Sequence, residues 1–472
     1  MNDELRVKDN ELGGKMNYRY RTDEEMKDNE SGFLERIPND WKVAKAQYYF
    51  NVYAGGTPST NEPAYWDGDI PWINSGEVQN CIVKKISRYI TERGLEESST
   101  KLIPKNTTLL AMTGATCGKV GYLTFDSTAN QSVMAFTEPR NCSSKFLFYY
   151  LICQNHQIEY FKTGGAQGGI NVDNGKKLYI NIPSKTEQEK IAKFLDEKTA
   201  QFDSIISKKE ALIEKLEEAK KSLISEVVTG KVRVVKTNDG YELVERKKEE
   251  MKDSGVEWLG DIPKEWDLKR SNYVFKFSKG LSITKENLKD EGIPCINYGE
   301  IHSKYGFEVN PKRHKLKCVT EEYFNSNPNA LIKYGHFVFA DTSEDIQGCG
   351  NFSYLNAEDS IFAGYHTIIV RPIKTVSSRY LAYLFDSDDW RIQIRTKVSG
   401  IKVFSITQSI LKTTKVILPT LSEQKLIVDY LDNKFVNINS MINNMKKQIE
   451  KLKEAKQSLI SEAVTGKIEI LD

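Results

Sequence analysis

A glycine-rich stretch, MTGATCGKVG at residues 112–121, carries the residue types of a phosphate-binding loop. A Walker motif needs four residues between its glycines and a Ser or Thr after the lysine to hold magnesium. Here three residues separate the glycines, and a valine follows the lysine. The stretch is therefore interpreted as a turn between two strands, or as a loop whose Thr113, Thr116 and Lys119 contact a phosphate backbone or a base edge.

Other catalytic constellations are missing from the sequence. The nearest string to the Asn-Pro-Pro-aromatic motif of DNA methyltransferases is SNPNA at 326–330, which lacks the second proline and the aromatic residue. The histidines show no HExxH or paired-ligand spacing, and the cysteines show no CxxC pair, so neither a zinc site nor a disulfide frame is expected. We predict a non-catalytic chain with no metal or cofactor of its own.

Bulk composition limits the kinds of partner. The formal net charge is +2, so any surface that attracts a polyanion must be local. No apolar run approaches the roughly 18 residues that a membrane span needs, and the amino terminus lacks the apolar core of a signal peptide. We therefore expect a chain that is not bound to a membrane and that lies in the reducing cytoplasm.

Local basic clusters and a second glycine-rich segment, TGGAQGGIN at 163–171, are the remaining candidates for binding. Such clusters are either solvated faces or contacts to phosphates and base edges, and the glycine-rich segment is either a flexible loop or a place where backbone approaches a ligand. The candidate DNA-contacting residues here are Lys84, Lys85, Arg88, Gln167, Asn171, Lys312, Arg313, Lys315, Arg391, Arg395, Lys397 and Lys402.

The sequence that carries these candidates is duplicated. SLISEVVTGKV at 222–232 returns as SLISEAVTGKI at 458–468, an offset of 236 residues, which is half of the 472-residue chain. At the same offset TEQEKIAKFLDEK (186–198) matches SEQKLIVDYLDNK (422–434). The chain is therefore a tandem repeat of a unit of about 230 residues.

Each copy begins with an α+β mixture. In the first copy, TLLAMT (108–113) and KVGYLTF (119–125) are typical of strands, and residues 144–161 are predicted to form one amphipathic helix. The regular alternation of a doubly wound sheet is not seen.

Each copy ends in a long helix. Residues 186–228 contain neither Pro nor Gly and repeat apolar residues in heptads, which predicts a rod of roughly 64 Å. A helix of this length needs a partner for its apolar stripe, and the stripe of the other copy is the obvious one. We expect an antiparallel coiled coil of the two helices, related by a pseudo-two-fold axis. The predicted seam is Ile191, Leu195, Phe202, Ile205, Leu212, Leu216, Leu223, Ile427, Leu431, Ile438, Met441, Met445, Leu452 and Leu459.

These signals divide the chain into six segments. They are a disordered leader (1–30), a first α+β domain (31–185), a first long helix (186–230), a linker (231–252), a second α+β domain (253–421) and a second long helix (422–468). The expected architecture is two similar α+β domains separated by the coiled coil.

The duplicated unit resembles the specificity subunit of type I restriction-modification systems. The motifs that carry the resemblance are the proline, Glu-Gln and apolar-Asp positions that open each long helix, together with MKDSGVEWLGDIPKEW (251–266) and MTGATCGKVG. The helix-opening positions are Pro183, Glu187, Gln188 and Phe194–Asp196, and again Pro419, Glu423, Gln424 and Tyr430–Asp432. The first counterpart of the MKDSG phrase is degraded to MKDNESGFLERIPNDW (26–41).

The resemblance implies two target-recognition domains, each reading one half of a split double-stranded DNA sequence, with the coiled coil as a ruler between them. It also implies two methyltransferase subunits as partners and, for restriction, motor-nuclease subunits. S-adenosylmethionine, ATP and magnesium would belong to those partners. The alternative is a coiled-coil scaffold whose globular ends bind protein rather than DNA.

Overall fold

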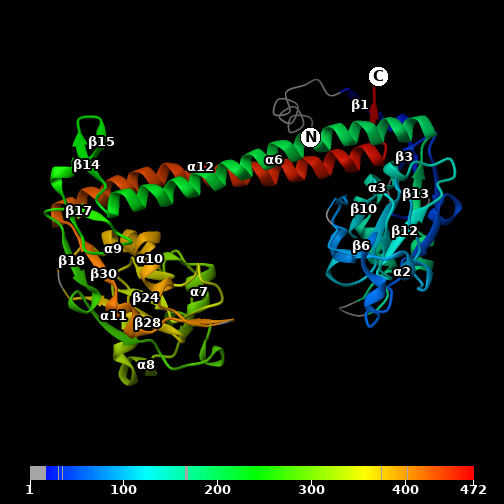
Figure 1. Ribbon diagram of the computed structural model, residues 1–472. Helices are drawn as coiled ribbons and strands as arrows, with labels where there is room; N and C mark the ends of the chain where they lie inside the picture. Colours follow the sequence, from blue (N-terminus) through cyan, green and yellow to red (C-terminus); the bar gives the residue numbers. More distant parts are fainter. Residues whose placement is uncertain are drawn as a thin grey trace. The chain divides into compact units, whose positions relative to one another are not determined.

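The computed structural model describes residues 17–29, 31–33, 36–84, 86–164, 168–373, 375–400 and 402–471 (Figure 1). The chain divides into two compact units, one of residues 1–210 with 446–472 and the other of residues 211–445. Each unit holds one α+β domain and parts of both long helices. The first unit is built from two distant stretches of sequence, and the second is one continuous stretch.

The first unit is organised around a five-stranded sheet and a three-stranded sheet. Its strands are β4 (Lys42–Lys45), β5 (Asn51–Ala54), β6 (Trp66–Ile73), β7 (Cys81–Ile82), β8 (Arg88–Ile90), β9 (Thr108–Ala111), β10 (Val120–Tyr122), β11 (Thr128–Ala129), β12 (Val133–Thr137) and β13 (Tyr179–Ile182). The larger sheet has the order β5-β12-β9-β10-β7 and the smaller one β11-β6-β8, while β13 pairs with β4. Only the pairs β10–β7 and β11–β6 are parallel among these described strands.

The second unit repeats this topology. Its strands are β18 (Asp267–Arg270), β19 (Phe275–Lys279), β20 (Ile293–Ile296), β21 (Phe307–Val309), β22 (Lys317–Val319), β23 (Leu331–Ile332), β24 (Phe337–Ala340), β26 (Phe352–Leu355), β27 (Ile361–Ala363), β28 (Thr367–Pro372) and β30 (Lys415–Leu418). The larger sheet is β19-β28-β24-β26-β21, with β26–β21 parallel, and the smaller one is β22-β20-β27-β23. The two five-stranded sheets match strand for strand, and the smaller sheet of the second unit has one further strand, β23. This correspondence confirms the predicted α+β class and internal repeat.

The helix predicted over residues 144–161 is two helices, α3 (Ser144–Ile152) and α4 (Asn155–Phe161). Their counterparts are α9 (Ser378–Asp386) and α10 (Asp388–Arg395), which are also separate. The prediction of one helix was wrong because the apolar pattern continues across the break, while the chain turns so that Gln157 bonds the backbone of Tyr179.

The long helices are α6 (Lys185–Val228) and α12 (Leu421–Val464), each of 44 residues. They pair antiparallel in both units. In the first unit Lys209 Nζ donates to Gln448 Oε1 at 2.7 Å, and in the second Lys220 Nζ donates to Asn439 Oδ1 at 2.8 Å. The predicted antiparallel pairing is confirmed.

Most of the predicted seam is buried, but its middle is shifted by one residue. Leu212 and Met441 are 46% and 52% exposed, while Ile206 and Ile442 are buried. A straight helix drifts by about 20° per heptad against a strict 3.5-residue repeat, so the seam passes to the following residue. The buried predicted residues are Ile191, Leu195, Phe202, Ile427, Leu431, Met445, Leu452 and Leu459, and the half-buried ones are Ile205, Leu216, Leu223 and Ile438.

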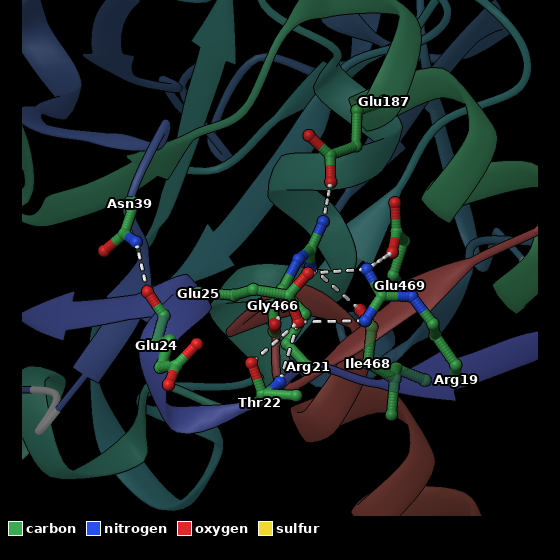
Figure 2. A network of polar contacts seen from close by, with 10 residues as sticks. All are labelled: Arg19, Arg21, Thr22, Glu24, Glu25, Asn39, Glu187, Gly466, Ile468 and Glu469. Carbon is green, nitrogen blue, oxygen red and sulfur yellow. Dashed lines mark hydrogen bonds and ion pairs between the residues drawn. The ribbon is translucent and has the colours of Figure 1, made fainter.

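The amino-terminal segment is part of the first unit. Strand β1 (Tyr18–Tyr20) pairs with β31 (Ile468–Ile470), and β2 (Met26–Asp28) pairs with β3 (Arg36–Pro38). The prediction of a disordered leader over 1–30 was thus wrong for residues 17–29, and the remainder of it lies outside the described residues. The high charge of this segment suggested disorder, but its charged side chains form ion pairs within the unit. Figure 2 shows the pair of Arg19 with Glu25, at 2.7 Å.

In the second unit, short paired strands lie in the segment that was predicted to be a linker. Strands β14 (Val232–Thr237) and β15 (Gly240–Glu245) form a hairpin, and β16 (Met251–Asp253) pairs with β17 (Asp261–Pro263). The predicted linker, residues 231–252, is therefore a folded part of the second unit, as residues 17–28 are of the first.

A glutamate at the start of each long helix joins these segments. In the first unit Glu187 accepts from Arg21 Nη2 at 2.7 Å, and Arg21 also donates to the carbonyl of Gly466 at 3.0 Å (Figure 2). Glu187 accepts a second bond from Trp41 Nε1 at 3.0 Å. The Arg21 guanidinium lies 5.8 Å from the centroid of the Trp41 ring. The ion pair of Glu187 and Arg21 therefore connects the amino-terminal segment, the domain, the helix start and the end of the other repeat.

The second unit has the same junction. Glu423 accepts from Arg246 Nη2 at 2.7 Å and from Trp266 Nε1 at 2.9 Å, and Arg246 lies 5.4 Å from the Trp266 ring centroid. The side chain of Arg246 is 5% exposed, so this ion pair is largely shielded from water.

We expect Arg21→Ala to lower the stability of the first unit by about 2–3 kcal/mol, because it leaves a largely buried carboxylate without its cation. Arg246→Ala should act likewise on the second unit. Hydrogen exchange resolves the two, since protection should fall at the start of α6 in one variant and of α12 in the other. The control is Arg93→Ala, which removes an exposed pair with Glu97 and should cost about 0.5 kcal/mol or less. An effect of Arg21→Ala no larger than this control would contradict the role of the junction.

Candidate nucleic-acid interface

Three loops meet at one edge of the five-stranded sheet in each unit. The hairpin loop lies between β9 and β10 in the first unit and between β24 and β26 in the second. The strand loop lies between β11 and β12 in the first unit and between β27 and β28 in the second. The helix loop follows α4 in the first unit and α10 in the second. Their residues are 112–119, 130–132 and 162–171 in the first unit and 341–351, 364–366 and 396–407 in the second. Gly165 to Gln167 of the first helix loop lie outside the described residues.

Backbone hydrogen bonds tie the three loops together in the first unit. The Met112 N–H donates to the Ser132 carbonyl at 2.8 Å, which joins the hairpin and strand loops. The Ile170 N–H donates to the Met112 carbonyl at 3.0 Å, which brings in the helix loop. Gly169 fits this contact because an added Cβ would lie 2.4 Å from the Met112 oxygen.

The same bonds recur in the second unit. The Asp341 N–H donates to the His366 carbonyl at 3.1 Å, and the Ile406 N–H donates to the Asp341 carbonyl at 2.7 Å. Strands β25 (Thr342–Ser343) and β29 (Phe404–Ser405) extend the contact between the hairpin and helix loops. The two units thus share one backbone frame for these loops.

The side chains on this frame differ between the units. In the first, the exposed loop residues include Thr113, Lys119 and Gln131; in the second they include Glu344 and His366. Base edges in the major groove are distinguished by the pattern of hydrogen-bond donors and acceptors that they present. A common frame with different polar side chains can therefore read two different sequences.

A cavity of about 390 Å³ lies in the second unit between the hairpin loop and α7 (Tyr298–Ser303). His302 is one of the residues that line the cavity. Its Nδ1 accepts from Asn351 Nδ2 at 2.9 Å, so Nε2 carries the proton and donates to the Thr342 carbonyl at 2.8 Å. This bond fixes the start of the hairpin loop against α7.

Each domain is also fixed to its own helix by an aspartate of the repeated helix-opening motif. Asp196 accepts from Tyr149 Oη at 2.6 Å, and Asp432 accepts from Tyr383 and from Arg379 Nε, the latter at 3.0 Å. Burial, together with the bond to aspartate, raises the pKa of both tyrosines above the ordinary value, so each phenol stays protonated as a donor. The loops are therefore held in a set orientation to the helix within each unit.

In the first unit the structure brings together candidates that were predicted from separate motifs. Thr113, Thr116 and Lys119 lie in the hairpin loop, and Asn171, which caps α5 (Val172–Lys176), ends the adjacent helix loop. The strand-turn-strand interpretation of this stretch is confirmed, and contact with DNA remains a prediction.

Other first-unit candidates lie elsewhere. Lys84 lines a cleft against both long helices, together with Asp203 and Lys456. The Arg88 guanidinium lies 3.8 Å from the centroid of the Trp66 ring. Lys85 and Gln167 lie outside the described residues.

Two second-unit candidates have partners inside the unit, and their contact with DNA stays a prediction. The Arg391 side chain is 13% exposed and bonds Asp386 at 2.8 Å and Asn351 Oδ1 at 2.7 Å, and burial lowers its pKa. Arg395 is 17% exposed and donates to the Gln347 carbonyl of the hairpin loop at 3.0 Å. Both arginines support this loop from inside the unit, because each donates to one of its residues.

The remaining second-unit candidates are exposed. Lys402 lies in the helix loop, next to the hairpin loop, and Lys397 donates to Thr413 Oγ1 at 2.9 Å. Lys312 and Arg313 form surface ion pairs with Asp359 and Glu308, and Lys315 is exposed beside them. For this cluster both the solvated-face and the phosphate-contact interpretations stay open.

Sequence reasoning missed the strand loop. Its residues, Asn-Gln-Ser in the first unit and Gly-Tyr-His in the second, separate two apolar strands and could have been noticed for their position alone. Within the described residues no cluster of His, Cys, Asp and Glu is suited to a metal ion, and no helix there is long and apolar enough to span a membrane.

The fold and the paired loop surfaces define a protein with two similar binding domains on a pair of long helices. A family model described as the type I restriction modification DNA specificity domain matches residues 38–218 and 263–451, so the chain belongs to this family.

Comparison with individual proteins agrees with this assignment. The chain is 22% identical over 442 residues to the type I restriction enzyme MjaVIII specificity subunit of Methanocaldococcus jannaschii, with 92% of this chain and 94% of that one covered. It is 32% identical over 162 residues to the EcoR124I/EcoR124II specificity subunit of Escherichia coli, covering 32% and 38%. A solved chain from a study of complex assembly in the type I R-M system has the same fold, with a TM-score of 0.65 at 14% identity and coverage of 91% and 99%.

The strand loop of the second unit depends on a glycine. A Cβ on Gly364 would lie 1.9 Å from Asn297 Oδ1, which also accepts from the Tyr365 N–H at 3.3 Å. We expect Gly364→Ala to lower the free energy of unfolding by about 1–3 kcal/mol through overpacking, measured by denaturant unfolding.

The matched control is Gly299→Ala on α7, where an added Cβ meets nothing within 4 Å. Its effect should stay within about 0.5 kcal/mol. Equal effects of the two substitutions would show that the Asn297 contact does not constrain the strand loop.

Proposed function

We propose that this chain is the sequence-specific DNA-binding subunit of a type I restriction-modification complex. In this proposal each unit reads one half of a split DNA target through its three loops, and the long helices set the gap between the halves. The observation that carries the proposal is the shared backbone frame with different side chains, since two readers of different half-sites need the same scaffold and different polar contacts.

The partners follow from this role. We propose that two methyltransferase subunits join the chain and supply S-adenosylmethionine chemistry, and that motor-nuclease subunits supply ATP-dependent and magnesium-dependent cleavage. This chain would bind and orient the DNA without a catalytic step of its own, in the cytoplasm where the DNA lies. A coiled-coil scaffold that binds only protein is not favoured, because the chain belongs to a DNA specificity family.

Electrostatic contacts should position the DNA without reading it. Exposed lysines such as Lys119 in the first unit and Lys402 in the second lie in the loops beside the polar residues. Contacts of this kind release counterions from phosphates and make affinity fall as salt rises. Base-edge contacts from the neighbouring loop side chains would then provide the specificity.

A domain exchange tests the proposal. Residues 253–421 are replaced by the matching domain of another family member that retains the tryptophan equivalent to Trp266, so the junction with Arg246 and Glu423 is kept. The methylated sites of the complex, formed with the methyltransferase partner, are profiled before and after the exchange.

We expect one half of the recognised sequence to change and the other half to stay, because each unit holds its own loops on its own sheet. Wrong base pairs typically cost about 1–3 kcal/mol each, so the altered half should be clearly resolved. A change in both halves, or methylation that ignores this chain, would contradict the proposal.

A further inference from the structure

His366 is the most exposed polar group of the second strand loop. Its side chain is 57% exposed, and its backbone has a φ of +54°, in the left-handed region that costs a side-chain-bearing residue free energy. The carbonyl of His366 accepts from the Asp341 N–H, so the hairpin loop holds the residue in this conformation. Strain of this kind is found where the position of a side chain matters.

The imidazole ring is oriented by a carboxylate. His366 Nδ1 lies 3.1 Å from Asp341 Oδ1, at the first residue of the hairpin loop. Because the ionised carboxylate only accepts, Nδ1 carries the proton and donates, and the neutral ring keeps an acceptor lone pair on Nε2. Asp341 thus determines which kind of partner Nε2 can bind.

Two tyrosines flank the ring. The Tyr298 and His366 ring centroids are 5.4 Å apart at 72°, and those of Tyr365 and His366 are 6.0 Å apart at 83°. Edge-to-face contacts of this geometry are favourable and limit rotation of the imidazole. The histidine is therefore a preorganised acceptor at the edge of the loop surface.

We infer that His366 reads a base in the half-site of the second unit, with Asp341 as its positioning residue; this inference rests on the proposed function. The Nε2 lone pair would accept a hydrogen bond from the exocyclic amino group of an adenine or a cytosine, which both present a donor in the major groove. In the first unit Ser132 occupies the equivalent position, since its carbonyl accepts the matching bond from Met112. The first unit therefore presents a serine hydroxyl to the DNA where the second presents an imidazole.

The test uses the whole complex with its methyltransferase partner and profiles methylated sites for the wild type and for His366→Gly. Glycine removes the imidazole and also tolerates the positive φ, so the loop keeps its backbone conformation. We expect discrimination at one adenine- or cytosine-containing position of the second half-site to fall about tenfold or more. The first half-site and the gap should not change.

Three further variants separate a positioning role of Asp341 from general structural support. Asp341→Ala should relax the same position, Asp341→Asn should restore it because the amide oxygen still accepts from Nδ1, and Asp341→Ala combined with His366→Gly should relax it no further than His366→Gly alone. The control is His314→Ala, which removes a histidine of the same unit that stacks on Tyr305 at 4.7 Å. This variant should leave the recognised sequence unchanged.

Thermal unfolding checks that each variant is folded, and His366→Asn, which also tolerates the left-handed conformation, replaces His366→Gly if that variant is not. Full discrimination in a folded variant without the imidazole would overturn the inference, as would relaxation in both half-sites. The proposed function fails separately, when the wild-type complex methylates no split sequence that depends on this chain.

Discussion

The carboxylate at the start of each long helix is the contact on which the architecture depends. Glu187 and Glu423 each accept from an arginine outside the domain and from a tryptophan within it, at 2.7–3.0 Å. The neighbouring glutamine, such as Gln188, accepts from the Ser143 N–H that opens α3 and donates to the carbonyl of the proline five residues earlier. A Glu-Gln pair therefore attaches the helix to its domain and to the strand that closes the unit.

The three loops contribute no residue to this junction, so they are free to vary. The sheet order and the backbone bonds among the three loops are shared by the two units, while the loop side chains are not. Mutations in these side chains do not touch the junction, because the junction residues lie at the helix start. A scaffold of this kind allows recognition to change while the fold is kept.

The sequence alone predicted the features that depend on periodicity and repetition: the α+β class, the duplication and the antiparallel helices. It placed the seam wrongly at Leu212 and Met441, because heptad counting does not include the drift of a straight helix. It missed the strand at Tyr18–Tyr20, whose partner lies at the other end of the chain, and it could not separate the buried Arg391 from exposed cations. Such outcomes are decided by tertiary contacts, which local composition does not contain.

The central claim is that the helices fix the distance between the two reading surfaces. Four helical residues are inserted after Glu210 and four after Met445, where the helices pass from one unit to the other, so contacts within each unit are kept. Each insertion adds about 6 Å and about 40° of net rotation, against about 3.4 Å and 35° per DNA base pair. Profiling of methylated sites should show the same two half-sites with a gap longer by one or two base pairs. An unchanged gap would contradict the account.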